Sequence, residues 1–183
     1  MENNNPAFQA LSLFTQRYIE QWQTEFNHLP RSTELYGMPS PCIIKKDDSA
    51  VFWLPVATNH HSLEVVEEVI YLTIHPDTRL FYSAQYAGDM MATFDERSLS
   101  LIQVWSDEDF SRLEQNMLAH LSMQKRLKRR PSVFIATTTD ETEIITIDNQ
   151  TGAVMLEKLI ENKTDKLAEN LATFLNGLKP IAQ

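Results

Sequence analysis

The sequence predicts an α+β fold, a single domain over residues 1–183 in which a mostly antiparallel sheet packs against helices. First, apolar residues recur at helical spacing at the start, middle and end of the chain. Second, short apolar runs with hairpin-like links fill the intervals, as in antiparallel sheets. Third, the chain is 43% hydrophobic, has only four glycines and lacks a linker-like stretch, which favours one core.

Four segments carry the helical pattern. The first ends at Leu29-Pro30, and the third begins at Ser106, a good N-cap that is followed by three acidic residues. Basic residues fill the last turn of the third helix before Pro131 stops it. Thr164 is the predicted cap of the last helix. The four predicted helices are residues 6–28, 62–71, 106–129 and 165–178.

Eight short apolar runs are predicted to be strands. Turn signals separate them, among them Gly88-Asp89, Asp95-Glu96 and Asp140-Glu141. The first two runs form a hairpin around a polar turn, and the last three form a meander. The predicted strands are residues 42–44, 50–56, 79–83, 90–94, 99–105, 133–136, 143–147 and 153–156.

The charge and hydropathy of the chain restrict the classes of function that it can have. The net charge is −9, with −7 in residues 1–100 and −2 in residues 101–183. An acidic field repels nucleic acid and favours basic partners, although acidity also serves solubility alone. The start MENNNPAFQAL lacks the basic and apolar regions of a secretory signal, and no apolar run approaches the roughly 20 residues of a membrane span. We therefore expect a soluble protein that binds no nucleic acid.

The motif search predicts neither a cofactor nor a metal. The four glycines are isolated, so no phosphate-cradling loop is present, and no GxSxG motif occurs. His60-His61 lies in a predicted loop and is a weak metal candidate, because adjacent residues in a strand point to opposite faces and rarely bind one ion together. The lone Cys42 allows no intramolecular disulfide and lies in an apolar strand start, where a free cysteine is typically a small buried hydrophobe.

Aromatic and acidic residues near turns form the candidate partner-binding set. Such a surface grips a basic peptide through cation–π contact and charge pairing, although partial core packing of the aromatic residues explains them equally well. The basic run Lys125–Arg130 complements the helix dipole and also suits anionic lipid. The candidate partner-binding residues are Glu34, Tyr36, Tyr86, Asp89, Trp105, Glu108 and Asp109.

Five long segments carry a family resemblance that spans nearly the whole chain. They are ELYGMPSPCII (34–44), FYSAQYAGDM (81–90), LIQVWSDEDFSRLEQN (101–116), QKRLKRRPSVFIAT (124–137) and LAENLATFLNGLKP (167–180). In these segments the chain resembles the Syd family, the SecY-interacting proteins of Gram-negative bacteria, and this resemblance places it among the SMI1/KNR4-like α+β domains.

The resemblance implies a binding protein that is not an enzyme. A Syd-like chain would attach loosely to the cytoplasmic side of the inner membrane, where an acidic concave surface binds the basic cytosolic loops of SecY and checks or restrains translocon assembly. Residues 127–130 are more basic than the resemblance leads one to expect, which suggests a minor lipid contact by Lys125–Arg130. A small enzyme with clustered carboxylates and a toxin-immunity-like binding protein remain the alternatives.

Overall fold

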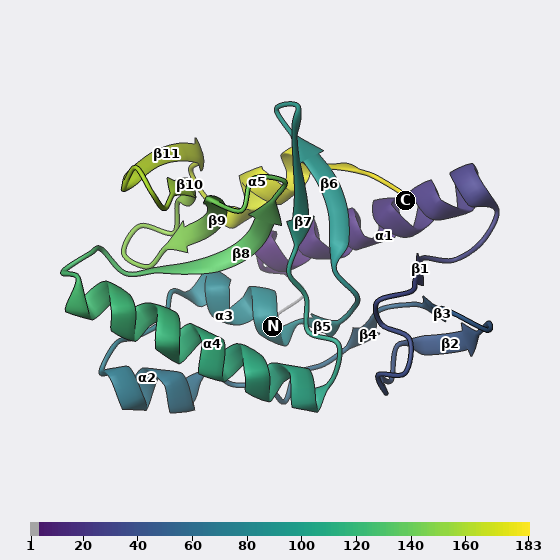
Figure 1. Ribbon diagram of the computed structural model, residues 1–183, viewed down its shortest axis with the longest axis horizontal. Helices are drawn as coiled ribbons and strands as arrows, with labels where there is room; N and C mark the ends of the chain where they lie inside the picture. Colours follow the sequence, from purple (N-terminus) through teal and green to yellow (C-terminus); the bar gives the residue numbers. More distant parts are fainter. Residues whose placement is uncertain (1–3) are drawn as a thin grey trace.

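A seven-stranded antiparallel sheet forms the centre of the computed structural model, which describes residues 4–183 (Figure 1). Its strand order is β11-β10-β9-β8-β7-β6-β12, and every neighbouring pair is antiparallel. This confirms the predicted α+β class; residues 1–3 of the predicted domain lie outside the described part. The strands are β6 Met90–Phe94, β7 Arg97–Leu101, β8 Ser132–Thr138, β9 Glu143–Asp148, β10 Val154–Lys158, β11 Lys163–Ala168 and β12 Lys179–Pro180.

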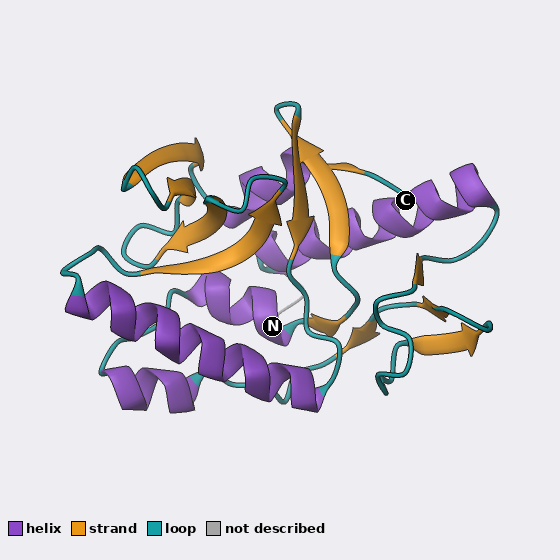
Figure 2. Ribbon diagram, in the orientation of Figure 1, coloured by secondary structure: helices purple, strands orange, loops and turns teal. Residues whose placement is uncertain are grey.

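Two smaller sheets lie beside the central one (Figure 2). The first has the order β1-β3-β2, and the second pairs β4 with β5. The β2–β3 hairpin of the first sheet confirms the predicted hairpin, but the strand predicted over residues 50–56 ends at Trp53, and residues 56–57 form β4 in the second sheet. Asp47 Oδ1 holds the hairpin turn by accepting the backbone N–H groups of Ser49 and Ala50 at 2.9 and 2.8 Å. The strands are β1 Arg31–Ser32, β2 Ile43–Lys46, β3 Val51–Trp53, β4 Val56–Ala57 and β5 Gln85–Tyr86.

In the described part of the chain, five helices cover the sheets. Helix α1 contacts α3 and α5, while α4 contacts β8 and carries α2 against its other side (Figure 1). Ser106 caps α4 as predicted, since its Oγ accepts the Asp109 N–H at 3.2 Å. Among residues 4–183, no helix is both long and apolar enough to cross a bilayer. The helices are α1 Pro6–Phe26, α2 Glu64–Ile70, α3 Pro76–Ser83, α4 Asp107–Arg126 and α5 Leu171–Gly177.

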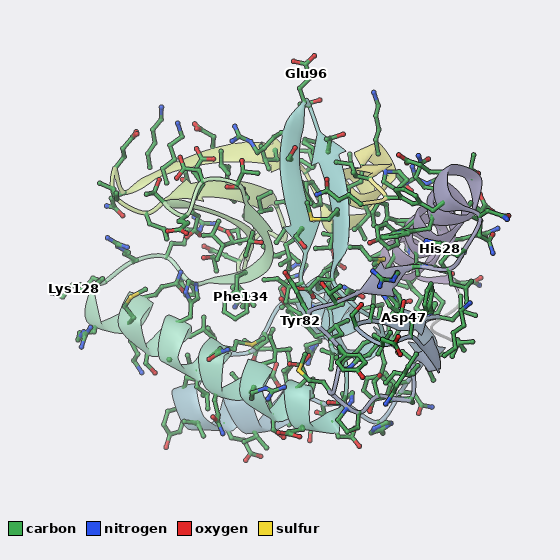
Figure 3. The ribbon with its side chains drawn as sticks, turned by 45° about the vertical axis from the view of Figure 1, so that its right-hand side comes forward. His28, Asp47, Tyr82, Glu96, Lys128 and Phe134 are labelled. Atoms are coloured by element: carbon green, nitrogen blue, oxygen red, sulfur yellow. The ribbon has the colours of Figure 1, made fainter. Side chains whose placement is uncertain are left out.

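One hydrophobic core joins the helices to the central sheet. In the apolar stripe predicted for the first helix, Leu11, Phe14, Tyr18 and Trp22 are buried, while Phe8 is half-buried and Phe26 is 44% exposed. The aromatic rings of this stripe continue into the small sheet, where Tyr18 stacks on Trp53. Tyr82 on α3 reaches the sheet itself, because its hydroxyl donates to the Phe134 carbonyl of β8 at 2.5 Å (both labelled in Figure 3). The largest fully buried side chains include Phe14, Trp53, Phe81, Tyr82 and Phe174.

The strand predicted at residues 79–83 is wrong, because this segment belongs to helix α3. The helix begins with the N-cap His75, whose Nδ1 accepts the Asp77 N–H at 3.2 Å, and has Pro76 in its first turn. Its buried residues Thr78, Phe81 and Tyr82 follow a three- and four-residue spacing. The predicted strand began at residue 79. It therefore left out the N-cap His75 and Thr78, the first buried residue of the helical spacing.

The last predicted helix, residues 165–178, is also wrong in its first part. Residues 163–168 form strand β11, which pairs with β10, and only Leu171–Gly177 is helical. Leu167 and Leu171 share a four-residue spacing that imitates a helix, but the hairpin with β10 overrides this local signal. The cap is Asn170, whose Oδ1 accepts the Thr173 N–H at 2.9 Å, while Thr164 lies in β11.

We predict that Asn170→Ala destabilises the protein by about 1 kcal/mol, because the first turn of α5 loses its capping acceptor. Thr164→Ala is the matched control and should change stability by less than about 0.5 kcal/mol, as exposed substitutions usually do. Urea unfolding followed by circular dichroism measures both. Equal losses for the two variants would contradict the capping role of Asn170.

Candidate partner-binding site

A cavity of ≈ 460 Å³ brings four of the seven predicted residues together. It lies where the small sheet β1-β3-β2 meets β6, β7, helix α1 and the first turn of α4. The four predicted residues in its lining are Glu34, Asp89, Trp105 and Asp109. The sequence therefore named acids from three separate segments that the fold gathers at one place.

Two tryptophan residues form the wall of this acidic cavity. The rings of Trp53 and Trp105 meet edge to face, with centroids 6.4 Å apart and planes at 85°. Trp105 is 3% exposed, its Nε1 donates to the Met38 carbonyl at 3.1 Å, and its own carbonyl accepts the Ser40 hydroxyl at 2.6 Å. A Cβ on Gly88 would lie 2.9 Å from the Trp53 ring, so this close approach requires glycine.

Backbone N–H groups fix two of the three carboxylates. Asp89 Oδ1 accepts the Gln103 N–H at 2.8 Å, and Asp109 Oδ2 accepts the Trp105 N–H at 2.9 Å. The third carboxylate, Glu34, is exposed at the rim. The one basic side chain among the lining residues, Arg31, is paired with Asp47 at 2.9 Å. The acidic cavity thus concentrates negative charge with little internal compensation.

The position of Asp89 changes its protonation. Its carboxylate reaches solvent through the acidic cavity, yet the cavity walls surround it on most sides. This burial raises the pKa of Asp89 to about 6, the Gln103 N–H opposes the rise, and repulsion from Asp109 and Glu34 adds to it. The carboxylate is therefore charged at neutral pH and titrates in the mildly acidic range.

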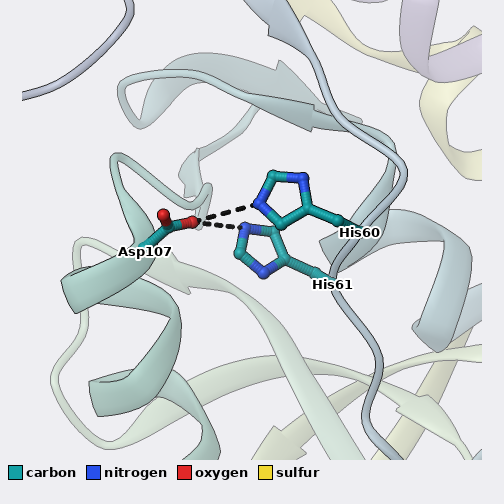
Figure 4. A group of neighbouring side chains, drawn as sticks. All are labelled: His60, His61 and Asp107. Carbon is teal, nitrogen blue, oxygen red and sulfur yellow. Dashed lines mark hydrogen bonds and ion pairs between the residues drawn. The ribbon is translucent and has the colours of Figure 1, made fainter.

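The other three predicted residues lie elsewhere. Tyr86 is only 6% exposed, and Figure 4 shows the cluster of His60, His61 and Asp107 that its hydroxyl contacts. Tyr36 is exposed but is not among the cavity residues. The Glu108 side chain is 81% exposed on α4, 3.6 Å from Arg112. For Tyr86 and Trp105 the core-packing alternative holds, although Trp105 still lines the acidic cavity.

Sequence reasoning missed several residues that build the acidic cavity. Tyr18 and Trp22 were assigned only to the core stripe of the first helix, and Trp53 only to a strand, yet all three line it. Gln103, which positions Asp89, gave no signal of its own. The isolated Gly88 was a usable clue, because a glycine beside an acid at a strand start often marks a close backbone approach.

The predicted basic run lies far along α4, away from the acidic cavity. Lys125, Lys128 and Arg129 border a separate hollow of ≈ 340 Å³ that Tyr71 also lines. Tyr71 is 90% exposed at the end of α2. Arg130 instead forms an ion pair with Asp148 within the chain. The basic run therefore has two roles. Arg130 belongs to an ion pair, while Lys125, Lys128 and Arg129 form an exposed basic–aromatic corner with Tyr71.

Comparison with known proteins gives a consistent answer over almost the whole chain. The family described as Syd protein (SUKH-2) matches residues 8–180. The relative "Protein Syd" of Pectobacterium atrosepticum is 47% identical, over 94% of this chain and 96% of its own length. "Protein Syd" of Yersinia pestis (strain Pestoides F) is 46% identical, over 94% of each chain.

We predict that Asp89→Asn stabilises the protein at neutral pH. The folded-state pKa of Asp89 lies above its unfolded value, so its stabilising contribution is present below the unfolded pKa and is lost as pH rises through about 6. The amide keeps the Gln103 hydrogen bond and removes the repulsion. After discounting for solvent access we expect a gain of about 1 kcal/mol, or about 2–4 °C in Tm, at about pH 7.5.

The difference in Tm between Asp89→Asn and the parent chain should shrink as pH falls to about 5, where the parent carboxyl takes up its proton. Thermal unfolding at a series of pH values measures it. A lower Tm for the variant at neutral pH, or a difference that does not vary with pH, would contradict the raised pKa.

Proposed function

This chain belongs to the Syd family, and from that membership and its acidic cavity we propose that it binds SecY. In this proposal a basic cytosolic loop of SecY enters the acidic cavity, and the protein sits peripherally on the cytoplasmic side of the inner membrane. Binding there checks or restrains translocon assembly without catalysis. The observation that carries the proposal is the gathering of Glu34, Asp89 and Asp109 beside two tryptophan rings.

The chemistry of the acidic cavity suits lysine and arginine side chains. Cytoplasmic loops of membrane proteins are rich in these residues. A cation that enters meets three carboxylates, which stand on a wall backed by the nearly buried Trp53 and Trp105 rings. Because Asp89 and Asp109 are fixed by backbone hydrogen bonds, the charges are pre-organised, which reduces the ordering cost of binding.

The alternative of a small enzyme with clustered carboxylates has less support. An acid–base pair works when both groups face one reacting atom. In the acidic cavity, Asp89 and Asp109 instead each face a different backbone N–H group. Such fixed carboxylates act naturally as a charge surface for a basic partner.

We predict that neutralising the acidic cavity weakens binding to SecY by about tenfold or more, which corresponds to about 1.4 kcal/mol. The variant is Glu34→Gln/Asp89→Asn/Asp109→Asn. The matched control, Asp95→Asn/Glu96→Gln/Glu161→Gln, removes the same charge elsewhere; Glu96 lies at the tip of the β6–β7 hairpin (Figure 3). Flotation with SecY-containing vesicles, at about 50 and about 300 mM salt, measures binding.

The parent and control proteins should bind SecY vesicles and lose affinity as salt rises, while the cavity variant should bind weakly at both salt concentrations. If the cavity variant binds as well as the control, the acidic cavity is not the SecY contact.

We also propose that the basic–aromatic corner touches the bilayer beside SecY. Val65 and Val69 are exposed one turn apart on α2, next to the 90% exposed Tyr71. Lys125, Lys128 and Arg129 border the same hollow as Tyr71, and Lys128 lies at the far end of α4 (Figure 3). An exposed tyrosine that shares its hollow with three cations matches the interface of an anionic membrane, whereas the exposed Glu64 and Glu68 flank the two valines.

We predict that Lys125→Gln/Lys128→Gln/Arg129→Gln reduces binding to phosphatidylglycerol-containing vesicles that lack SecY. Each basic residue near an anionic surface contributes about 1 kcal/mol, so the loss should exceed about tenfold. The control Lys45→Gln/Lys46→Gln/Lys179→Gln removes the same charge from other surfaces. Equal loss in both variants would show that net charge alone, and not this corner, governs lipid binding.

A further inference from the structure

Three donor side chains converge on one point beside α4. His60 and His61 come from the loop between β4 and α2, and Asp107 comes from the first turn of α4 (Figure 4). Asp107 Oδ1 lies 3.2 Å from His60 Nε2 and 3.4 Å from His61 Nε2. One ligand atom from each side chain lies within 4.8 Å of the others.

The surroundings hold both rings in place. The His61 side chain is 7% exposed and stacks on Phe110, with centroids 4.0 Å apart and planes at 17°. The more exposed His60 is oriented by Thr58, whose Oγ1 lies 2.8 Å from His60 Nδ1. A hydrogen bond to Nδ1 leaves Nε2 as the nitrogen that faces Asp107, as in sites where a second contact orients a metal-binding histidine.

We propose that His60, His61 and Asp107 bind one divalent transition-metal ion of the zinc class. The ion takes the place of the Tyr86 hydroxyl, which contacts all three ligand atoms, and keeps water at its remaining position. Tetrahedral zinc with bonds of about 2.0–2.1 Å separates neighbouring ligand atoms by about 3.3 Å. The 3.2 and 3.4 Å separations match this spacing before any ion is bound. Two imidazole nitrogens with one carboxylate suit zinc and neighbouring ions, whereas calcium and magnesium prefer oxygen ligands.

The Tyr86 hydroxyl offers a competing explanation for the same convergence. It donates to Asp107 Oδ1, and its oxygen lies 2.7 Å from His61 Nε2 and 2.9 Å from His60 Nε2. Without a metal, the hydroxyl could accept from both imidazoles and hold the cluster alone. Tyr86→Phe separates the two explanations, because it removes the hydroxyl and leaves all three proposed ligands.

Metal binding would tie two parts of the chain that are distant in sequence. The loop before α2 carries His60 and His61, and the start of α4 carries Asp107, which lies 46 to 47 residues later in the sequence. An ion that binds only the folded chain stabilises it in proportion to its occupancy. The inference is independent of SecY binding, so either proposal can fail without the other.

The test titrates Zn²⁺ alone, and Co²⁺ alone, into the full chain. We expect one ion per chain by calorimetry, a Tm that rises with Zn²⁺ concentration, and visible absorption of bound Co²⁺ at tetrahedral intensity. Loss of a group that only orients a metal ligand weakens metal affinity by about 10–100-fold, so we expect His60→Ala and His61→Ala, which each remove a ligand, to weaken binding at least as much. His28→Ala, which removes an imidazole elsewhere, and Tyr86→Phe should retain parental affinity.

Three results would overturn the proposal: no saturable Zn²⁺ binding by the parent chain, unchanged affinity in the His60→Ala/His61→Ala double variant, or loss of binding in Tyr86→Phe equal to that in the histidine variants. Circular dichroism of each variant shows that it is folded. Because the His60 side chain is 58% exposed, we expect His60→Ala to keep the native spectrum.

Discussion

The edge-to-face contact between Trp53 and Trp105 is the interaction on which the acidic cavity depends. Trp53 belongs to the small sheet, and Trp105 lies just before α4, so their contact joins two parts of the molecule. The joint needs Gly88, because a side chain there would strike the Trp53 ring. Tyr18 of helix α1 also stacks on Trp53, so the same contact extends to α1. Core packing therefore fixes the walls against which the carboxylates stand.

Desolvating the Asp89 carboxylate against such walls opposes folding, repulsion from Asp109 and Glu34 adds to the cost, and the raised pKa of Asp89 reflects both. The protein offsets part of it with backbone N–H donors from residues 103 and 105, which also set the direction of each carboxylate. A surface optimised for stability alone would not bring Asp89, Asp109 and Glu34 together. Local electrostatic strain of this kind is typical of sites that bind or react.

Sequence reasoning succeeded where the local signal and the tertiary structure agree. The long helix α1 was predicted from its periodic apolar stripe, and α4 was predicted because its Ser106 cap and its apolar stripe coincide. Helix α3 and strand β11 were missed because short segments take their state from packing and pairing partners. Acids near turns pointed to Glu34, Asp89 and Asp109, but only the folded chain shows that these three meet. His60 and His61 were set aside by a rule that holds for strands. Both lie in a loop, as predicted, and a loop lets both side chains face Asp107.

Helix α4 relates the proposed surfaces to one another. Asp107 and Asp109 are two residues apart, about 200° around the helix, so one turn serves both the histidine cluster and the acidic cavity. The helix has 20 residues, which places its basic end about 30 Å from this turn. An anionic membrane would attract the Lys125–Arg129 end and repel the acidic end. On the proposed function, this charge separation turns the acidic cavity away from the headgroups, toward basic loops that project from the membrane into the cytosol.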